Sequence, residues 1–357
     1  MVYRILTINP GSTSTKIAVF ENETGLFVET INHTNEELSG FERVTDQYEF
    51  RKEAILSVLN KHDISLSSLS IIVGRGGLLK PIESGVYEVN QKMITDLRDV
   101  RIGEHASNLG GLIAANLAEE SKSCKAYVAD PVVVDELSPL ARVTGHPLFK
   151  KISIFHALNH KAIARTYAAS VGKEYNQLNL IVAHLGGGVS VGAHLKGKVV
   201  EVNNALNGEG PFSPERSGTL PALALAELCF SGKYTLPQVK KMITGEGGLV
   251  AYLGTNSFRD VAQKVEEGDE KAALLFDAFA YNVAKAIGGC AAVFCGDVDA
   301  ILITGGIAHN AKLTGKISER VKFIAPVKIY PGEDEMTALA MNGLSILTGK
   351  EKVSIYE

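Results

Sequence analysis

The sequence predicts an α/β protein made of two related domains, and three observations support this. Segments with the pattern of strands and of helices alternate along the whole chain. A strand–loop–strand block at residues 3–20 is repeated at 180–195, where the two copies align without a gap, and each copy is followed by a turn and a third strand. The 357 residues also exceed what one hydrophobic core usually serves. We place the first domain at residues 1–150 and the second at 151–333.

The repeated block is a hairpin whose loop consists of small residues, followed by a second turn and a third strand. The first copy has its loop at residues 9–13 and the second at 184–188, and Asn9 aligns with His184. Two copies are too few for a solenoid, so the repeat indicates a duplicated domain. Two such loops could bind one phosphate chain from opposite sides.

The remaining elements follow from hydrophobic spacing. Residues 46–61 place Ile55, Val58 and Leu59 on one helix face, and short apolar runs that end at Gly or Asp indicate buried strands. The predicted helices cover 46–61, 91–100, 108–121, 156–171 and 334–347, with several more between 219 and 294. The predicted strands beyond the repeat cover 70–73, 125–129, 299–304 and 326–330.

The composition is that of a soluble globular protein. Lys and Arg number 36 and Asp and Glu 40, so the net charge is −4, which argues against nucleic acid or an anionic membrane as partner. The N-terminus enters a strand without a secretory signal, and acidic residues interrupt the most apolar stretch, 286–303. We expect a cytoplasmic protein whose four cysteines are buried thiols.

The first loop carries side chains that suit phosphate. Asn9, Ser12 and Ser14 offer side-chain and backbone donors, and Lys16 adds a positive charge. The spacing of a P-loop is absent, and a polar hairpin turn is the alternative interpretation. The second loop offers His184 and then bare backbone. Its three consecutive glycines, which elsewhere often serve only turns, are Gly186, Gly187 and Gly188.

Two arginines lie in loops where packing explains them poorly. Arg75 lies among glycines at the end of a predicted strand, and Arg216 lies in G-P-F-S-P-E-R-S-G. The forked guanidinium suits a carboxylate or a phosphate, although surface arginines are common. Asp130 closes another strand, where ligands tend to bind in α/β sheets, or it caps a helix.

Three further features remain open on pattern alone. His156 and His160 are four apart on a predicted helix, but no third metal ligand follows at a sensible spacing. Residues 304–310 form a strand, a glycine turn and a helix start, an arrangement that suits an anion or a nucleotide. Three acids, Glu333, Asp334 and Glu335, begin the last helix, either as partners of the helix dipole or with one of them as an oxygen ligand of Mg²⁺.

Together these motifs resemble the acetokinase family nearly from end to end. The segment I-N-P-G-S-T-S-T-K at residues 8–16 matches its first signature, and H-L-G-G-G at 184–188 matches its second. Acetate kinases usually have Asn where this chain has Gly187, and an aspartate where it has Ser257. Together with G-R-G-G at 74–77, the glycine favours the branch of the family that acts on butyrate.

The resemblance implies a fold, a reaction and an assembly. The fold is that of sugar kinases, heat-shock chaperones and actin, in which two ribonuclease-H-like domains flank a nucleotide cleft and the C-terminal helix, within 334–357, packs on the first domain. The reaction is the reversible, direct transfer of a phosphoryl group from ATP to a short-chain carboxylic acid, with Mg²⁺, giving ADP and an acyl phosphate. A homodimer or larger homo-oligomer is expected.

The resemblance also implies roles for individual residues. Arg75 would bind the substrate carboxylate, Arg216 would stabilise the phosphoryl group in transfer, and Asp130, His156 and His184 would complete the catalytic group. Glu335, with Asp130, would be linked to the metal ion. The residues expected to bind the nucleotide are Asn9, Ser12, Ser14, Lys16, Gly186, Gly187, Gly188, Phe258, Arg259, Gly305, Gly306 and Asn310.

Alternatives remain at the level of substrate and of class. Acetate, propionate, isobutyrate and branched acids differ from butyrate by only a few methyl or methylene groups. A sugar kinase of the same fold should need acids and amides around its acceptor, which the two arginines argue against. A non-catalytic, nucleotide-switched protein of the actin or chaperone kind should carry an additional partner-binding domain, for which the chain has little room.

Overall fold

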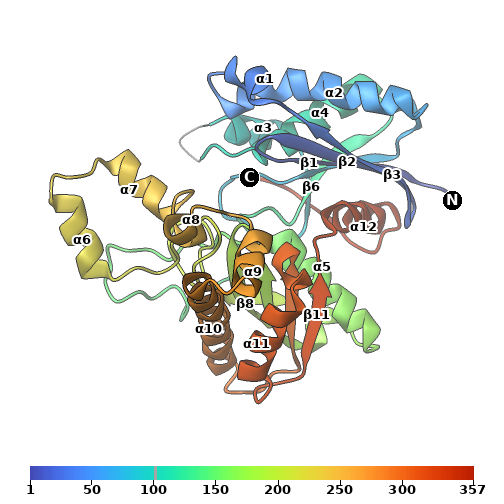
Figure 1. The fold of residues 1–357 in the computed structure, drawn as a ribbon. Helices are drawn as coiled ribbons and strands as arrows, with labels where there is room; N and C mark the ends of the chain where they lie inside the picture. Colours follow the sequence, from blue (N-terminus) through green and yellow to red (C-terminus); the bar gives the residue numbers. More distant parts are fainter. Residues whose placement is uncertain (100–102) are drawn as a thin grey trace. The chain divides into compact units, whose positions relative to one another are not determined.

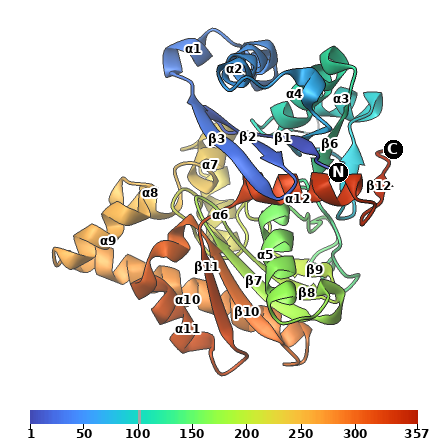
Figure 2. The ribbon, with the colours of Figure 1, turned by 90° about the vertical axis from the view of Figure 1, so that its right-hand side faces the viewer.

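The computed structural model of the protein describes residues 1–99 and 103–357. By their internal contacts these residues form two compact units. The first combines Met1–Val134 with Asp334–Glu357, and the second is Asp135–Glu333. Each unit is built on one mixed sheet covered by helices (Figures 1 and 2).

The first unit contains a sheet with the strand order β12-β5-β6-β4-β1-β2-β3. Its strands are β1 (Arg4–Pro10), β2 (Ser14–Glu21), β3 (Thr24–Asn32), β4 (Ile71–Arg75), β5 (Val86–Glu88), β6 (Lys125–Ala129) and β12 (Val353–Ser354). Its helices are α1 (Asn35–Ser39), α2 (Tyr48–Lys61), α3 (Gln91–Arg98), α4 (Asn108–Ser121) and α12 (Glu335–Leu347).

The two faces of this sheet are covered by different helices. Leu6 and Ile8 of β1 point to one face, where they join Ile55 of α2 and Ile113 of α4 in one buried cluster. Helix α12 packs on β1 and β4 from the other face. There Gly343 lies so close to Val73 that an added Cβ would be 2.9 Å from its Cγ2. Because side chains of β1 alternate between the two faces, the strand packs against α2 and α4 on one side and against α12 on the other.

The second unit contains a sheet with the strand order β11-β10-β7-β8-β9. Its strands are β7 (Asn179–Leu185), β8 (Val189–Leu195), β9 (Lys198–Val202), β10 (Ala300–Gly305) and β11 (Val327–Pro331). Its helices are α5 (Ala157–Ser170), α6 (Ala222–Phe230), α7 (Leu236–Ile243), α8 (Gly248–Leu253), α9 (Phe258–Glu266), α10 (Glu270–Val293) and α11 (Ala311–Val321).

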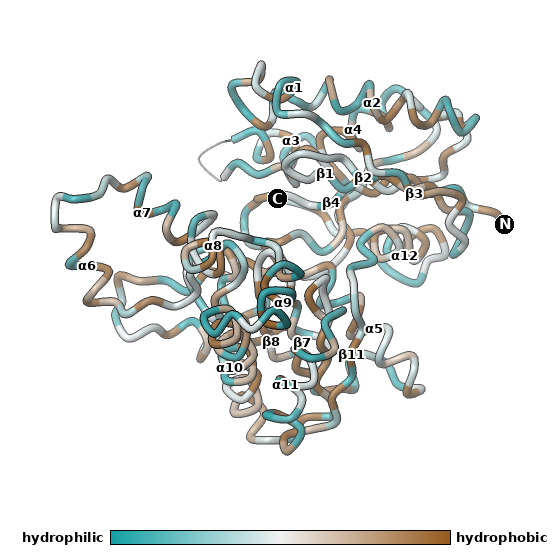
Figure 3. Tube along the Cα trace, viewed as in Figure 1, coloured by the Kyte–Doolittle hydropathy of each residue, from teal (hydrophilic) through white to brown (hydrophobic). Residues whose placement is uncertain are grey.

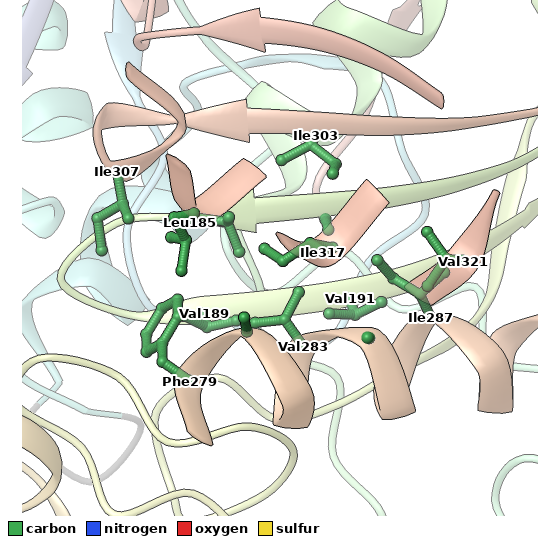
Figure 4. Close-up of a cluster of buried hydrophobic side chains, with 14 of the residues drawn as sticks. Leu185, Val189, Val191, Phe279, Val283, Ile287, Ile303, Ile307, Ile317 and Val321 are labelled. Atoms are coloured by element: carbon green, nitrogen blue, oxygen red, sulfur yellow. The ribbon is translucent and has the colours of Figure 1, made fainter. Parts of the chain in front are cut away.

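The main core of the second unit lies between its sheet and the helices α10 and α11 (Figure 4). Val189 and Val191 point from β8 toward Val283 and Ile287 of α10. A smaller cluster under α5 covers the opposite face and includes Tyr167. Because β8 contributes apolar side chains to the α10 side at every second residue, its alternate residues face α5.

The duplicated block is visible as the same topology in both sheets. Strands β1, β2 and β3 form an antiparallel meander, as do β7, β8 and β9. In each unit a later strand, β4 or β10, pairs in parallel with the first strand of the meander. The pairing of the second and third strands shifts register at Val19/Phe20 in one unit and at Ala193/His194 in the other.

The structure differs from the sequence-based expectations in a few places. The short strands β5 and β12 and the helix α1 carry too few residues for a periodic signal. Helix α3 ends at Arg98, and the expected helix end at residue 100 lies outside the described residues. The expectation of four buried thiols is wrong for Cys229 and Cys295, which are exposed.

Residues 135–150, which we expected in the first domain, make their contacts with the second unit. A buried ion pair accounts for this. Nζ of Lys161 on α5 lies 2.7 Å from Oε2 of Glu136, and both side chains are nearly inaccessible to solvent. The same oxygen accepts a hydrogen bond from the backbone of Val199 on β9. A buried charge needs such partners, so Glu136 belongs to this core.

Candidate functional site

The first loop is held in shape from behind by Arg51, a residue of α2 that the sequence analysis did not single out. Its guanidinium is fully buried and donates to the backbone carbonyls of Gly11, Ser12 and Ser14 at 2.8–2.9 Å. The loop itself closes with a hydrogen bond from Gly11 N to Ser14 O. Burial lowers the pKa of Arg51 to about 10, so the guanidinium remains charged at neutral pH.

This arrangement turns the carbonyl oxygens of the loop toward Arg51. The side chain of Ser12 is exposed, and Ser14 and Lys16 are half-buried. The hydroxyls of Ser12 and Ser14, whose carbonyls are bound by Arg51, and the nearby Lys16 give the loop a donor-rich edge with a positive charge. That edge is suited to an anion such as a phosphate group.

Asn9, Arg75 and Glu335 form one group at the ends of β1 and β4. Nη1 of Arg75 lies 3.2 Å from Oδ1 of Asn9 and 3.1 Å from Oε2 of Glu335. The amide of Asn9 also donates to Oε2 of Glu335. The Glu335 carboxylate is 7% exposed, so the guanidinium provides the positive charge that a buried anion requires. The structure thus brings together three residues expected at the site.

Asp130 lies at the carboxyl end of β6 in a left-handed conformation, with φ at 38°. Its Oδ1 accepts hydrogen bonds from the hydroxyl of Ser84 at 2.6 Å and from the backbone of Gly85 at 3.0 Å. Asp130 therefore fixes the turn before β5, and no helix begins at this residue. A buried carboxylate held in this way can orient the turn and also remain an oxygen ligand.

In the second unit, His184 is the last but one residue of β7, a strand that is buried throughout. Its ring is 1% exposed, and Nε2 lies 3.2 Å from Oε1 of Glu333. Nδ1 is buried and has no hydrogen-bond partner among the described residues. The ring stacks on His156 with centroids 4.1 Å apart. An orphaned buried ring nitrogen is uncommon in folded proteins and suggests a partner that binds there.

The three glycines after His184 differ in their surroundings. Gly186 donates to the carbonyl of Gly188 at 3.0 Å and closes the turn. Gly187 is exposed, and a Cβ added there would meet nothing within 4 Å. A Cβ on Gly188 would instead collide with Nη1 of Arg216. A Cβ on Gly186 would lie 3.1 Å from Oε1 of Glu333, so the third glycine has the most severe constraint, the first a milder one, and Gly187 none.

Arg216 reaches the second loop from the segment after β9. Its Nη1 donates to the carbonyl of Ala205 at 2.6 Å, and its backbone N–H donates to Ser213. Ser213 in turn donates to the carbonyl of Gly187 at 2.6 Å. Burial lowers the pKa of Arg216, although the neighbouring Glu215 opposes this effect. Arg216, the second loop and His184 thus form a second cationic group that could stabilise a phosphate.

The residues expected near the nucleoside fall into two sets. Gly305, at φ 95°, packs against the backbone of Leu185, and Gly306 is exposed at the start of a short 3-10 turn. Asn310 caps α11, accepting from the backbone of Leu313 at 2.9 Å. These three form the strand-turn-helix arrangement expected from the sequence.

Phe258 and Arg259 open α9 and face opposite environments. Phe258 is 8% exposed and packs between Phe276 and Phe279, with ring centroids 5.4 and 5.2 Å apart. Arg259 is exposed. Ser257, which stands where acetate kinases have an aspartate, caps this helix by accepting from the backbone of Asp260. Core packing by itself explains Phe258, so Arg259 is the better candidate for a ligand contact.

The described residues contain neither a candidate metal cluster nor a helix that could span a membrane. Between them, residues 1–99 and 103–357 contain no group of three or more His, Cys, Asp or Glu side chains that could hold a metal ion. None of the helices in these ranges combines the length and the apolar character that crossing a membrane requires.

Two α/β units with the same meander, each presenting a donor-rich loop and an arginine, define a phosphotransferase-like architecture. The sequence pattern of the acetokinase family matches residues 150–343. Butyrate kinase 1 of Clostridium acetobutylicum is 55% identical over 356 residues, which cover 100% of both chains. A probable butyrate kinase of Bacteroides thetaiotaomicron is 54% identical over 99% of this chain and 100% of its own.

Among solved structures, the acetate kinase of Porphyromonas gingivalis superimposes with a TM-score of 0.80 at 19% identity, covering 97% of this chain and 100% of its own. This likeness concerns the fold. The chain belongs to the acetokinase family. The expected α/β fold and the expected family are therefore confirmed.

Proposed function

We propose that this chain transfers the γ-phosphoryl group of ATP to the carboxylate of butyrate, giving ADP and butyryl phosphate in a reversible reaction. The observation that carries the proposal is the full-length identity of 52–55% to butyrate kinases and probable butyrate kinases. At such identity over whole chains, an enzyme class is normally retained. The expected class, a kinase with a carboxylate as acceptor, agrees with the arginine found in each unit.

In this proposal the first unit supplies the acceptor site. Arg75 would bind the butyrate carboxylate with its guanidinium fork, while Asn9 and Glu335 hold that guanidinium in place. A carboxylate is already an anion at neutral pH, so the acceptor needs no general base. The chemical problem is instead to bring this anion toward a phosphate that is also negatively charged.

The second unit would neutralise that charge. Arg216 and His184 would donate to phosphoryl oxygens, and Gly186, Gly187 and Gly188 allow the backbone to approach them closely. Lys16, Ser12 and Ser14 of the first loop would add further donors. Catalysis would then consist mainly of positioning and of electrostatic stabilisation, as in other phosphoryl transfers.

Mg²⁺ is the metal ion that we propose for the reaction. Glu335 and Asp130 are carboxylates, and Mg²⁺ in kinases prefers a few carboxylate oxygens together with phosphate oxygens. The buried position of both acids fits such a role. When bound, Mg²⁺ would neutralise phosphate charge. ATP as the nucleotide has the support of family membership, and the cytoplasmic location stays a prediction.

The test is an acyl phosphate assay with hydroxylamine, in which the purified enzyme receives ATP, Mg²⁺ and straight or branched acids of two to six carbons. We expect kcat/KM to be highest for butyrate. Each methylene more or less should change it by about 10- to 200-fold, the usual discrimination of an apolar pocket. A maximum at acetate, propionate or isobutyrate would contradict the choice of acid. Absence of any hydroxamate with all acids would contradict the enzyme class.

We also propose that the protein forms a homodimer or larger homo-oligomer. Helix α6 buries none of its residues although its mean hydropathy is high, and it appears as a brown segment beside α7 in Figure 3. Leu223 is 73% and Phe230 92% exposed. A second apolar run before α5 exposes Leu148 by 82% and Phe149 by 70%. Such patches on a soluble protein often mark interfaces.

Light scattering after size exclusion tests this assembly. The wild type should elute at a multiple of 38.2 kDa, and Phe230→Glu should lower that mass. Phe323→Glu is the matched control, because Phe323 is 82% exposed on a different segment of the same unit. A wild-type monomer, or equal dissociation of both variants, would contradict an interface at α6.

A further inference from the structure

A continuous chain of hydrogen bonds runs through the second unit from His156 to Tyr175. Ser190 Oγ lies 2.8 Å from Nδ1 of His156 and 2.8 Å from Nε2 of His160. Nδ1 of His160 lies 3.2 Å from Nε2 of His194. The hydroxyl of Tyr175 then lies 2.7 Å from Nδ1 of His194. Four hydrogen bonds thus connect five side chains.

This chain of hydrogen bonds follows from two spacings in the sequence. His156 directly precedes α5 and His160 lies four residues later, so both are on one helix face. Ser190 and His194 lie four residues apart on β8, and the period of two places both on the face toward α5. Gly192 lies between them, and a Cβ there would be in van der Waals contact with Nδ1 of His160, 3.4 Å away.

The two central imidazoles are neutral. His160 and His194 are 0% exposed. Burial holds the pKa of each well below 6.5. The charge of His184 lowers the pKa of His160 further, a hydrogen bond with the backbone of Ser190 opposes this, and the charge of Lys161 lowers it. His160 and Lys161 act in the same direction on His194. Each of these rings therefore carries one proton, on one of its two nitrogens.

Within these four hydrogen bonds, counting protons leaves two arrangements. Ser190 has one hydroxyl proton, so it donates to one histidine and accepts from the other. A neutral ring that accepts at one nitrogen must donate at the other. If Tyr175 donates to His194, then His194 donates to His160, His160 donates to Ser190, and Ser190 donates to Nδ1 of His156. In the second arrangement, every bond is reversed.

The bond at Tyr175 decides between them. A phenol is more acidic than an imidazole N–H, and an imidazole nitrogen is a better acceptor than a phenolic oxygen. The short O···N distance of 2.7 Å suits an O–H donor. Tyr175 therefore donates, and a neutral His156 has to carry its proton on Nε2.

We propose that Tyr175 is a positioning residue of the phosphoryl transfer, which sets the tautomer of His156 through Ser190, His160 and His194. This inference rests on the proposed function. The His156 ring stacks on His184, and its Cε1 would lie 3.3 Å from a Cβ on Gly188, beside Arg216. At this place an N–H on Nε2 is a donor for an anionic oxygen, whereas a lone pair on Nε2 would repel it.

The direct test is the imidazole nitrogen spectrum of the enzyme labelled with ¹⁵N-histidine. The chain has nine histidines, and His156→Gln assigns the signals of His156 by their loss. In the wild type we expect His156 protonated on Nε2, and in Tyr175→Phe a shift of the proton toward Nδ1. Tyr167→Phe is the control, because Tyr167 belongs to the same small cluster under α5 and has no bond to an imidazole in the described structure.

A kinetic cycle provides the second readout. We expect Tyr175→Phe to lower kcat by about three- to tenfold, the scale of one net hydrogen bond, with both KM values within twofold of the wild type. Ser190→Ala interrupts the hydrogen-bond chain before His156. In this background, Tyr175→Phe should change kcat by less than twofold. A purely structural tyrosine would give the same loss in both backgrounds.

The outcomes separate this inference from the proposed function. An enzyme without acyl kinase activity would contradict the function, and the nitrogen spectrum would still report on the tautomer. The inference is overturned if the wild-type His156 carries its proton on Nδ1, or if Tyr175→Phe leaves the His156 signals unchanged while thermal unfolding shows a folded protein.

Discussion

Nη1 of Arg75 donates a hydrogen bond to Oε2 of Glu335, 3.1 Å away and 260 positions later in the sequence. Asn9 contacts both side chains. This group connects the end of β4, the end of β1 and the first turn of α12, so the C-terminal helix reaches the predicted acceptor arginine directly. The position of Arg75 therefore depends on a segment that follows the entire second unit along the chain.

Glu335→Gln should loosen Arg75 without removing it. The amide has no charge to attract the guanidinium, so we expect KM for butyrate to rise by about tenfold, the equivalent of roughly 1.4 kcal/mol. Initial rates at saturating ATP and Mg²⁺ give this value. The neighbouring Asp334→Asn is the control, since Asp334 caps α12 and does not contact Arg75. A wild-type KM in Glu335→Gln would show that Arg75 needs no such support.

Arg51→Lys should unfold the first loop locally while keeping a positive charge. One ammonium group cannot donate to three carbonyls from the same position, so buried acceptors lose partners. We expect a loss of about 1–3 kcal/mol in the free energy of unfolding and a higher KM for ATP. Urea unfolding and kinetics measure the two effects. Lys61→Arg, on the exposed end of the same helix, should change neither.

Gly187→Ala and Gly188→Ala form a matched pair. Both residues have a backbone that alanine tolerates, because neither has a positive φ. The first Cβ meets open space, and the second displaces the end of the Arg216 side chain. We expect kcat to fall by about 10²–10³ in Gly188→Ala, as in Arg216→Ala, and to fall less in Gly187→Ala, whose Cβ leaves Arg216 in place and opposes only the approach of the phosphate.

Thermal unfolding distinguishes the displacement of Arg216 from misfolding as the cause of a lower kcat. A flexible arginine end can move aside, so both glycine variants should melt within a few degrees of the wild type. Equal kcat in the two variants would mean that the position of Arg216 does not limit catalysis. A combined Gly188→Ala, Arg216→Ala enzyme should be no slower than Arg216→Ala, because the two changes affect the same group.

Stability should decrease as the pH falls below about 6.5. The unfolded chain protonates the His160 and His194 imidazoles near their ordinary pKa of 6.5, whereas burial lowers both pKa values in the folded protein. The unfolded state then binds more protons. The two imidazoles contribute their full share to the free energy of unfolding above pH 7, and this share is lost as the pH falls. For each imidazole, the free energy of unfolding should decrease by on the order of 1 kcal/mol per pH unit.

Denaturant unfolding between pH 5.5 and 7.5 measures this slope. His194→Gln should reduce it by about half, since one of the two rings is gone. His146→Gln is the control, because His146 is exposed. A slope that is unchanged in His194→Gln would assign the pH dependence to other groups.

Much of the fold could be predicted from local patterns. Strand β6 has the predicted bounds, and α2, α4 and α5 each begin and end within two residues of the prediction. Periods of two and of 3.6 residues are imposed by the backbone itself, so they are visible in any short window. Elements of two to five residues, such as β5, β12 and α1, are too short to show a period.

The site was only partly predictable for a different reason. Arg51, Ile55 and Leu59 share one buried helix face, four residues apart, and this spacing was a signal that a charged residue points into the unit. The spacing could not identify the partners of Arg51, because these are backbone carbonyls of a loop, which every residue type has. The acids 333–335 looked equivalent, yet Glu333 contacts His184, Asp334 caps α12 and Glu335 contacts Arg75.

The sequence by itself determined the order of elements, the duplicated hairpin, the two donor-rich loops and the family. These depend on spacings within a few residues and on motifs that are read in one stretch. Only the tertiary structure decided that Arg75 meets Glu335, that Arg51 holds the first loop, and that Tyr175 reaches His156 through three other side chains. Such contacts depend on strand register and on helix packing, which sum many weak interactions over the whole chain.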